Sequence, residues 1–457
     1  MSSFKELGLS PAMLDNLGRL DYFEPTAIQA QALPPALAGK DVIAMAQTGS
    51  GKTAAFGIPL IEKLRPRQFA VQALVLCPTR ELADQVAKSL RELARARDNT
   101  KVLTLCGGVP IGPQIGSLSH GAHIIVGTPG RVEDHLRKGT LNLDRLTTLV
   151  LDEADRMLDM GFEEVMQSIL AQTPATRQTL LFSATWPESI RSISARFQKQ
   201  PEDVRAEAGS AGPDIEESFY EIADGQQVEA VAAVLSRFQP SSCLVFCGTR
   251  RECDELAGAL TGLGFSAVSL HGDLDQKERD STLVKFGNQS CTVLVATDVA
   301  ARGLDIKALP LVINAGPARD PEVYTHRIGR TGRAGEQGHA VTLCTPRQGH
   351  KITQLETARS QVASWGDTAQ LLAERVRPVR PPMRTLCLAG GRKEKVRPGD
   401  VLGALTGEAG IPGPAVGKID LFDFQCFVAV EAKWAEKALS RLEQGRVKGR
   451  KIRVRFA

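Results

Sequence analysis

A glycine-rich segment near the N-terminus has the residue types of a phosphate-binding loop. It reads Ala46-Gln47-Thr48-Gly49-Ser50-Gly51-Lys52-Thr53 and follows the apolar run Val42–Ala46, which predicts a buried strand. Glycines let backbone N–H groups turn inward around phosphate oxygens, and the N-terminus of the following helix adds a favourable dipole. We expect Lys52 to contact the outer phosphates of a nucleotide and Thr53 to ligate Mg²⁺.

A second group of reactive residues, Asp152-Glu153-Ala154-Asp155, follows the apolar run Thr148–Leu151. Open α/β sheets bind ligands at the carboxyl ends of their strands, where these carboxylates would lie. Asp152 would hold Mg²⁺ mainly through water, because this ion dehydrates reluctantly. Glu153 could orient and deprotonate the water that attacks a γ-phosphate. Together with the upstream loop, these carboxylates predict a nucleotide-hydrolysing site.

The elements that must position these residues are apolar runs that alternate with amphipathic, helix-like stretches. Strands alternating with helices predict a parallel α/β sheet with helices on both faces. The pattern weakens at 206–214, which has linker composition, and then restarts. We therefore expect two α/β lobes, 1–208 and 215–373. The predicted strands are Val42–Ala46, Ala73–Cys77, His123–Val126 and Thr148–Leu151 in the first lobe, and Ser242–Phe246, Ala267–Leu270, Thr292–Ala296 and Leu311–Asn314 in the second.

The C-terminal part of the chain has a different pattern. A proline-rich linker, 374–382, is followed at 383–457 by strand, helix, two strands, helix and strand, which predicts an α+β ferredoxin-like domain of the kind found in RNA-recognition motifs. From Arg375 onward 18 Lys and Arg face 8 Asp and Glu, a net charge of +10, whereas the whole chain carries +4. This excess predicts a polyanionic partner for the tail. The densest basic segment contains Arg446, Lys448, Arg450, Lys451, Arg453 and Arg455.

Composition excludes several other classes of protein. Hydrophobic residues make up 42% and charged residues 24% of the chain, which is ordinary globular composition. No apolar stretch has the length of a membrane helix, and the N-terminus lacks the apolar run of a secretory signal. The nine cysteines form no CxxC pair. We therefore expect a cytoplasmic protein with reduced, buried thiols, no membrane contact and no zinc site.

The two nucleotide motifs and several further segments, taken in order, resemble those of the DEAD-box RNA helicases over nearly all of the first 370 residues. The resemblance implies that both lobes are RecA-like, that ATP and Mg²⁺ are the cofactors, and that RNA is the partner. Pro25-Thr26-Ala27-Ile28-Gln29 is similar to the family's adenine-reading segment. This similarity implies that Gln29 hydrogen-bonds adenine and that Phe4 or Tyr22 supplies an aromatic contact.

The resemblance also implies a role for each matching residue. ATP is bound by the phosphate loop with Gly303 and Asp305, and the catalytic set is Lys52, Asp152, Glu153, Arg330 and Arg333. An arginine brought to the moving phosphate can accelerate hydrolysis ~10³–10⁵-fold. Asp155, Ser183, Thr185 and His326 couple hydrolysis to strand separation. The residues expected to bind RNA in the lobes are Pro78, Thr79, Arg80, Gly108, Thr128, Pro129, Gly130, Arg131, Gln276, Arg279, Thr297 and Arg302.

The tail departs from an ordinary RNA-recognition motif, which stacks bases on aromatic residues of its two central strands. Leu386-Cys387-Leu388 contains no aromatic residue, and of the second set only Phe427 fits, because Gln425 and Val430 occupy the other positions. A helicase core joined to such a basic domain resembles the bacterial DEAD-box helicases that act on large-subunit ribosomal RNA. The resemblance implies 23S ribosomal RNA as the partner.

Two other functions are compatible with parts of this pattern. One is a DNA-translocating helicase, which an ATPase assay comparing DNA with RNA would distinguish. The other is a non-catalytic RNA clamp or assembly scaffold. The presence of Lys52, Glu153, Arg330 and Arg333 disfavours the clamp, because a scaffold needs no hydrolytic residues.

Overall fold

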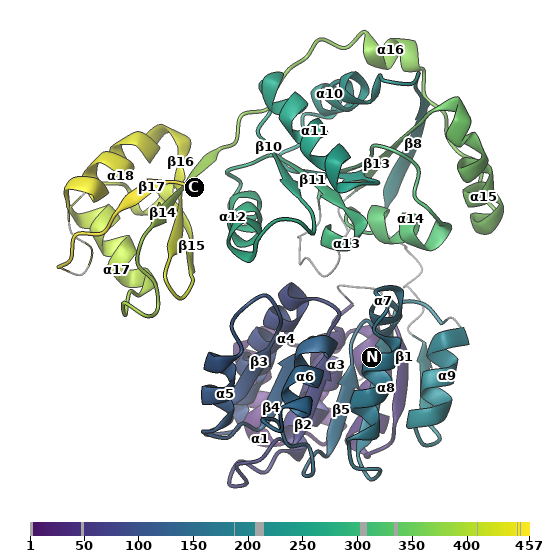
Figure 1. The fold of residues 1–457 in the computed structure, drawn as a ribbon, viewed down its shortest axis with the longest axis vertical. Coiled ribbons are helices and arrows are strands. Elements are labelled where there is room, and N and C mark those ends of the chain that lie inside the picture. The colour runs from purple at the N-terminus through teal and green to yellow at the C-terminus, as the bar shows by residue number, and fades with distance from the viewer. Residues whose placement is uncertain are drawn as a thin grey trace. The chain divides into compact units, whose positions relative to one another are not determined.

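The computed structural model describes residues 3–46, 50–186, 188–205, 214–301, 309–332, 337–408, 410–445, 447 and 449–457. The chain divides into two compact units, one made of Met1–Gly212 with Gly303–Asp305 and the other of Pro213–Arg302 with Ile306–Ala457. A seven-stranded sheet forms the centre of the first unit (Figure 1), and the second unit contains a six-stranded and a four-stranded sheet. Residues 206–213 of the predicted linker at 206–214 lie outside the described residues.

The first sheet is entirely parallel and has the order β3-β4-β2-β5-β6-β1-β7. The four strands predicted from apolar runs are present within one residue of the expected bounds. Strands β3, β6 and β7 were not predicted. The strands are β1 (Val42–Met45), β2 (Ala73–Leu76), β3 (Val102–Leu105), β4 (Ile124–Gly127), β5 (Thr148–Leu151), β6 (Gln178–Ser183) and β7 (Glu202–Arg205).

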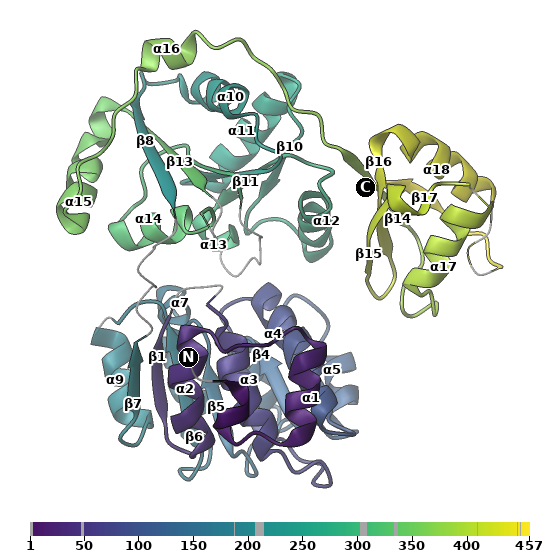
Figure 2. The same ribbon diagram turned by 180° about the vertical axis from the view of Figure 1, so that it is seen from behind.

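Helices cover both faces of this sheet, as predicted (Figures 1 and 2). Because successive strand residues point to opposite faces, Val75 and Val150 pack in a core with α1 to α4, whereas Leu74 and Leu149 pack in a second core with α6 to α9. The helices are α1 (Pro11–Arg19), α2 (Ala27–Leu37), α3 (Lys52–Lys63), α4 (Arg80–Leu93), α5 (Gly112–Leu118), α6 (Pro129–Arg137), α7 (Ala154–Asp159), α8 (Glu163–Ala171) and α9 (Glu188–Phe197).

The six-stranded sheet of the second unit is also entirely parallel, with the order β10-β11-β9-β12-β13-β8. The four predicted strands are again present, and β8 and β13 were not predicted. The strands are β8 (Ile215–Glu221), β9 (Cys243–Cys247), β10 (Ala267–Leu270), β11 (Val293–Thr297), β12 (Leu311–Asn314) and β13 (Gly338–Cys344). The helices are α10 (Gln227–Phe238), α11 (Arg250–Gly262), α12 (Gln276–Gly287), α13 (Asp298–Ala301), α14 (Pro321–Ile328), α15 (Gly349–Arg359) and α16 (Thr368–Leu372).

The C-terminal sheet is antiparallel, with the order β15-β16-β14-β17. Its chain order, strand-helix-strand-strand-helix-strand, confirms the predicted ferredoxin-like arrangement. Residues 375–381 form no helix or strand, in agreement with their high proline content. The elements are β14 (Met383–Leu388), α17 (Pro398–Gly403), β15 (Val416–Leu421), β16 (Cys426–Glu431), α18 (Ala432–Gln444) and β17 (Val454–Phe456).

The burial of the cysteines agrees with the expectation from the sequence. All nine cysteines are buried and form no disulfide. In the described part of the chain, no helix combines the length and the apolar character needed to cross a membrane.

Candidate nucleotide and RNA site

The nucleotide motifs of the first unit meet at one edge of its sheet. Strands β5, β6 and β1 are neighbours and run parallel, so their carboxyl ends lie together. The first of these ends is followed by Asp152, the second ends at Ser183, and the third leads into the phosphate loop and Lys52. Of the predicted loop residues, Gln47, Thr48 and Gly49 lie outside the described part of the chain.

Two buried polar atoms at this edge have no hydrogen-bond partner among the described residues. They are Nζ of Lys52, which is 6% exposed, and Oδ1 of Asp152, which is 3% exposed. An unpaired buried charge is costly, so such atoms usually mark a place that a ligand completes. An ammonium and a carboxylate oxygen suit the phosphates and the Mg²⁺ of Mg-ATP. Asp152 would hold the metal together with Thr53, the second residue of α3.

Burial raises the pKa of the Asp152 carboxyl from its usual 3.8 to about 6, Lys52 counteracts this increase, and Glu153 adds to it. A protonated carboxyl cannot ligate Mg²⁺. We therefore expect the affinity for Mg-ATP to fall as the pH falls from neutral through about 6, where Asp152 takes up a proton. Titration with a fluorescent ATP analogue in the presence of Mg²⁺ measures this change. The Asp152→Asn variant is the control, and an equally steep pH dependence in that variant would contradict the assignment.

Glu153 is held in an unusual backbone conformation at the start of α7. Its φ and ψ are 52° and 51°, in the left-handed region, and its side chain is 3% exposed. Its Oε2 accepts a hydrogen bond of 2.8 Å from Nη1 of Arg156, a residue that is itself 4% exposed. This arginine was not predicted as a site residue. Its ion pair with Glu153 is buried and fixes the position of that carboxylate at the start of α7.

Asp155 joins the acidic motif to the carboxyl end of β6. Its Oδ2 accepts hydrogen bonds from the backbone N of Ala184 at 3.1 Å, the backbone N of Thr185 at 2.9 Å and the hydroxyl of Thr185 at 3.0 Å. The hydroxyl of Ser183 donates to the carbonyl of Thr185 at 2.7 Å. The structure thus brings together the predicted coupling residues of the first lobe. A movement of the acidic motif must therefore also move the segment from Ser183 to Thr185, and the reverse.

The segment predicted to read adenine contacts the end of the phosphate loop. Nε2 of Gln29 donates to the carbonyl of Gly51 at 3.0 Å, and its Oε1 accepts from the backbone N of Thr26 at 3.0 Å. The hydroxyl of Thr26 donates to the carbonyl of Ser50 at 2.8 Å. Gly51 has a φ of 92° and lies against Gln29, so a side chain at Gly51 would be strained and crowded.

The two aromatic candidates for adenine contact differ in exposure. Phe4, in the 3₁₀ helix Phe4–Leu7, is 3% exposed and belongs to the core that contains α1 to α4. Tyr22 is 36% exposed. Only Tyr22 of this pair presents its ring at the surface of the unit, so it is the remaining candidate for a base contact.

The residues expected to contact RNA in the first unit lie at the other half of the same sheet edge. They follow the carboxyl ends of β2, β3 and β4. Nη1 of Arg80 is buried and has no partner among the described residues, which suits a phosphate oxygen. The guanidinium of Arg131 instead donates to Oε1 of Gln114 at 3.0 Å and to the carbonyl of Val109 at 2.8 Å. Arg131 therefore fixes the loop that contains Gly108. The remaining residues are Pro78, Thr79, Thr128, Pro129 and Gly130.

In the second unit the predicted RNA contacts lie at the start of α12 and at the end of β11. Arg279 donates to the carbonyl of Ala300 at 2.9 Å, and Gln276 donates to Asp280 at 2.7 Å. The hydroxyl of Thr297 accepts from the backbone N of Ala300 at 3.4 Å. The contact between Arg279 and Ala300 ties α12 to α13. The predicted residues Arg302, Gly303, Asp305 and Arg333 lie outside the described part of the chain.

The arginine motif of this unit is anchored by a residue that the sequence did not single out. Arg327 makes two hydrogen bonds to Asp298, at 2.6 and 2.9 Å, and donates to Oδ1 of Asn314 at 3.2 Å. Arg330, two residues after the end of α14, is 3% exposed, and His326 is half-buried. Arg327 therefore has a structural role in this motif. The spacing of the residues alone could not distinguish it from the catalytic candidates Arg330 and Arg333.

In the tail, the predicted basic segment is exposed, whereas the predicted stacking ring is not. Arg450, Lys451, Arg453 and Arg455 are exposed, and Arg446 and Lys448 lie outside the described residues. Phe427 is 3% exposed and packs with Cys387 of β14 and Val284 of α12. The sheet face therefore presents no stacking platform at Phe427, in agreement with the missing aromatic residues.

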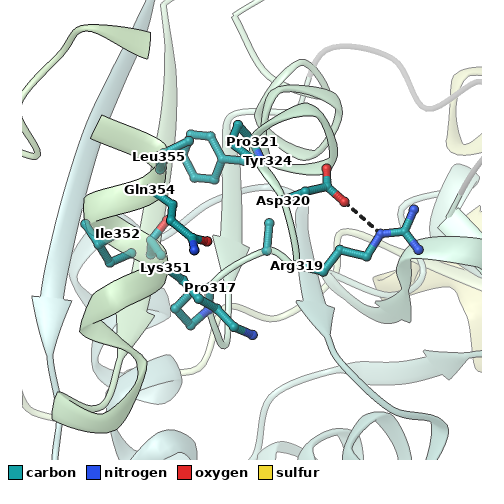
Figure 3. Close-up of a pocket in the computed structure, with 11 residues that line it drawn as sticks. Pro317, Arg319, Asp320, Pro321, Tyr324, Lys351, Ile352, Gln354 and Leu355 are labelled. Atoms are coloured by element: carbon teal, nitrogen blue, oxygen red, sulfur yellow. Dashed lines mark hydrogen bonds and ion pairs between the residues drawn. The ribbon is translucent and has the colours of Figure 1, made fainter. Parts of the chain in front are cut away.

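A separate pocket lies between α14 and α15 (Figure 3). Its lining includes Tyr324, Lys351 and Leu355, and Arg319 pairs with Asp320 at 2.9 Å. Asp320 also caps α14 by accepting from the backbone N of Val323 at 2.8 Å. Arg319 and Asp320 of this pocket therefore have structural partners.

Comparison with known proteins agrees with this arrangement. The sequence matches the DEAD/DEAH box helicase family over residues 26–193, the helicase conserved C-terminal domain over 226–335, and the DbpA RNA-binding domain over 385–456. The chain belongs to the DEAD-box ATP-dependent RNA helicases, and its two RecA-like lobes carry out RNA-dependent ATP hydrolysis. The non-catalytic and DNA-translocating alternatives are thereby set aside.

Individual relatives show how far the similarity extends. The chain is 52% identical to the ATP-dependent RNA helicase DbpA of Escherichia coli (strain K12), and the alignment covers 100% of both chains. It is 48% identical to the DEAD-box helicase CshA of Geobacillus kaustophilus, with 78% of this chain and 76% of that protein covered. Among solved structures, Saccharomyces cerevisiae Dbp5 bound to RNA and ADP BeF3 matches with a TM-score of 0.73 and 29% identity, over 80% of this chain and 96% of the other.

Proposed function

We propose that this helicase acts on 23S ribosomal RNA during assembly of the large ribosomal subunit. The observation that carries the proposal is the tail, which matches the DbpA RNA-binding domain over 385–456, has a net charge of +10 from Arg375 onward, and belongs to a chain 52% identical to DbpA along its whole length. Contacts to phosphates position a protein on RNA but carry no sequence information. The motifs of the two lobes resemble such backbone contacts, so the tail must supply the specificity.

The catalytic roles that we propose follow from the contacts in the first unit. Lys52 binds the outer phosphates of ATP, and Asp152 with Thr53 holds Mg²⁺, which neutralises charge on those phosphates when bound. Glu153, which accepts a hydrogen bond from Arg156, orients the attacking water and accepts its proton. Arg330 and Arg333 stabilise the charge that develops on the transferred phosphate.

The coupling of hydrolysis to RNA uses residues that lie next to those of the ATP site. Asp155, two residues after Glu153, accepts three hydrogen bonds at its Oδ2 from Ala184 and Thr185, and the hydroxyl of Ser183 donates to the carbonyl of Thr185. RNA bound by Arg80 and its neighbours, at the ends of β2, β3 and β4, would therefore influence the adjacent hydrolytic residues. We propose that His326 of the second lobe takes part in the same coupling. In this proposal Gln29 and Tyr22 contact adenine.

The proposed division of the chain is a first RecA-like lobe at 1–208, a second at 215–373, a linker at 374–382 and an RNA-binding domain at 383–457. The tail binds its own RNA element and, through the linker, raises the effective concentration of neighbouring RNA at the lobes. The lobes then separate short duplexes near the bound element. We expect these events to take place in the cytoplasm.

Truncation of the tail tests this proposal. A chain ending at Arg380 should keep ATPase activity with any RNA at high concentration, because both lobes are present. It should lose the preference for 23S ribosomal RNA over an unrelated RNA of equal length. The measurement is a pair of ATPase titrations for each protein at one salt concentration, because phosphate contacts depend strongly on salt. Equal discrimination by the two proteins would place specificity in the lobes and refute the proposal.

A further inference from the structure

One end of the C-terminal sheet presents an exposed aromatic ring. Phe424 lies in the turn between β15 and β16 and is 66% exposed. The register pairs Leu421 of β15 with Cys426 of β16, so the turn projects from the end of the sheet. Exposing a large ring to water is unfavourable, and an exposed aromatic residue beside charged groups is typical of a binding surface. The rings of Phe422 and Phe427, in contrast, pack edge-to-face with centroids 5.5 Å apart.

A basic loop is fixed directly beside this turn. The backbone N of Arg392 donates to the carbonyl of Phe422, and that of Lys393 donates to the carbonyl of Asp423, both at 2.9 Å. Gly391 makes the approach possible, because a Cβ atom there would lie 2.6 Å from the backbone of Asp423. The loop is closed by a hydrogen bond of 2.7 Å from the backbone N of Gly391 to Glu394. The backbone of the turn that carries Phe424 is therefore held in place by hydrogen bonds to this loop.

Two segments of the chain place basic residues at the same end of the sheet. Arg392, Lys393 and Arg397 are exposed and form no ion pair among the described residues. The second segment precedes β17, where the carbonyl of Arg453 accepts from the backbone N of Ala389 at 2.9 Å. Because β14 pairs with both β16 and β17 through Leu388, the loop after β14, the turn before β16 and the segment before β17 all lie at one end.

We propose that this end of the sheet binds single-stranded RNA, with one unpaired base stacked on Phe424 and the adjoining phosphates on Arg392, Lys393 and Arg397. The inference rests on the proposed RNA-binding role of the tail and assigns a subsite to it. Single-stranded nucleic acid is bound by aromatic rings on which bases stack, together with cations that follow the backbone. Because Phe427 is buried, Phe424 takes over the stacking that the sheet face of an ordinary RNA-recognition motif performs.

Substitutions in the full-length protein test the subsite. Phe424→Ala should weaken the binding of 23S ribosomal RNA about 5- to 150-fold, because stacking contributes roughly 1–3 kcal/mol per base. Phe424→Trp should retain near-normal affinity, because indole also stacks. The matched control is Phe69→Ala, which removes an equally exposed ring (66%) from the first unit and should leave affinity unchanged. Binding is followed by fluorescence anisotropy at one salt concentration.

The contribution of the basic residues to RNA binding is tested by a second measurement, the dependence of affinity on salt. A double variant, Arg392→Ala with Lys393→Ala, should reduce the slope of log affinity against log salt by about 1–2, as expected for the loss of one or two phosphate contacts. RNA that contains 5-iodouridine should crosslink to Phe424 in the wild-type protein, as mapped by mass spectrometry. An unchanged affinity and salt slope in these variants would overturn the subsite, as would crosslinks confined to other residues, and would point to a protein partner for this surface.

The failure of the subsite and the failure of the proposed function give different results. If the wild-type protein prefers 23S ribosomal RNA and Phe424→Ala behaves like Phe69→Ala, the function stands and the subsite is wrong. If the wild-type protein binds ribosomal and unrelated RNA equally, yet Phe424→Ala weakens both, the subsite stands and the ribosomal specificity is wrong.

Discussion

The Glu153→Gln variant should retain the binding of ATP and RNA while its RNA-stimulated turnover falls by ~10²–10⁴-fold, the usual contribution of a positioned general base. Glutamine has nearly the same shape as glutamate, so the left-handed backbone at Glu153 and the packing of α7 should persist. The amide lacks the negative charge needed to accept a proton from water. The loss should therefore appear in kcat rather than in KM.

A charge-removing control separates this effect from a general change in electrostatics. Glu164→Gln removes an exposed carboxylate from α8 of the same unit and should leave turnover unchanged. Steady-state ATPase assays with and without RNA, combined with nucleotide titrations, measure both quantities for each variant. Near-normal RNA-stimulated turnover in Glu153→Gln would remove Glu153 from the hydrolytic step, and would leave its ion pair with Arg156 as a structural feature only.

In the two parallel sheets, seven of the eight strands that the sequence predicted lie inside a sheet, and the eighth, β10, lies at an edge. Parallel strands covered on both faces need continuous apolar runs, and Ala73–Leu76 and Leu311–Asn314 have them. The other three edge strands of these sheets, β3, β7 and β8, were missed because one side of such a strand faces solvent and its sequence is mixed. Three of the four residues of β7 (Glu202–Arg205) are exposed, and it lies at the edge of its sheet. β6 begins with the buried polar residues Gln178 and Thr179, whose distant partners, Ala36 and Asp41, no local pattern reveals.

The residues of the candidate site could be predicted where they belong to a short sequence motif. They could not be predicted where their role depends on contacts with residues that the motif does not contain. The phosphate loop and Asp152 each follow a recognisable strand, so spacing predicted their meeting at one sheet edge. The spacing of the residues could not show that the guanidinium of Arg131 donates hydrogen bonds to Gln114 and Val109. It also could not show that Arg156 pairs with Glu153. The solvent exposure of a side chain likewise cannot be derived from a single sequence.

The second lobe should be indispensable for RNA-stimulated hydrolysis, because Arg330 and Arg333 are absent from the first unit. A fragment ending at Ala211 contains a complete seven-stranded sheet with an apolar core on each face, so it should fold alone. It should bind Mg-ATP through Lys52 and Asp152. Its RNA-stimulated turnover should nevertheless be lower by ~10³–10⁵-fold, which is the contribution of an arginine at the transferred phosphate.

A point substitution in the whole chain distinguishes the loss of the arginine from the loss of the lobe. Arg330→Ala should reduce RNA-stimulated ATPase activity nearly as far as the truncation does, without changing nucleotide affinity in the absence of RNA. Arg347→Ala removes an arginine from the same unit whose side chain is 87% exposed, and it should have no effect. Circular dichroism on each protein confirms folding before the ATPase titrations. Full RNA stimulation in the fragment, or in Arg330→Ala, would show that hydrolysis does not need Arg330, and that the first unit by itself stabilises the charge on the transferred phosphate.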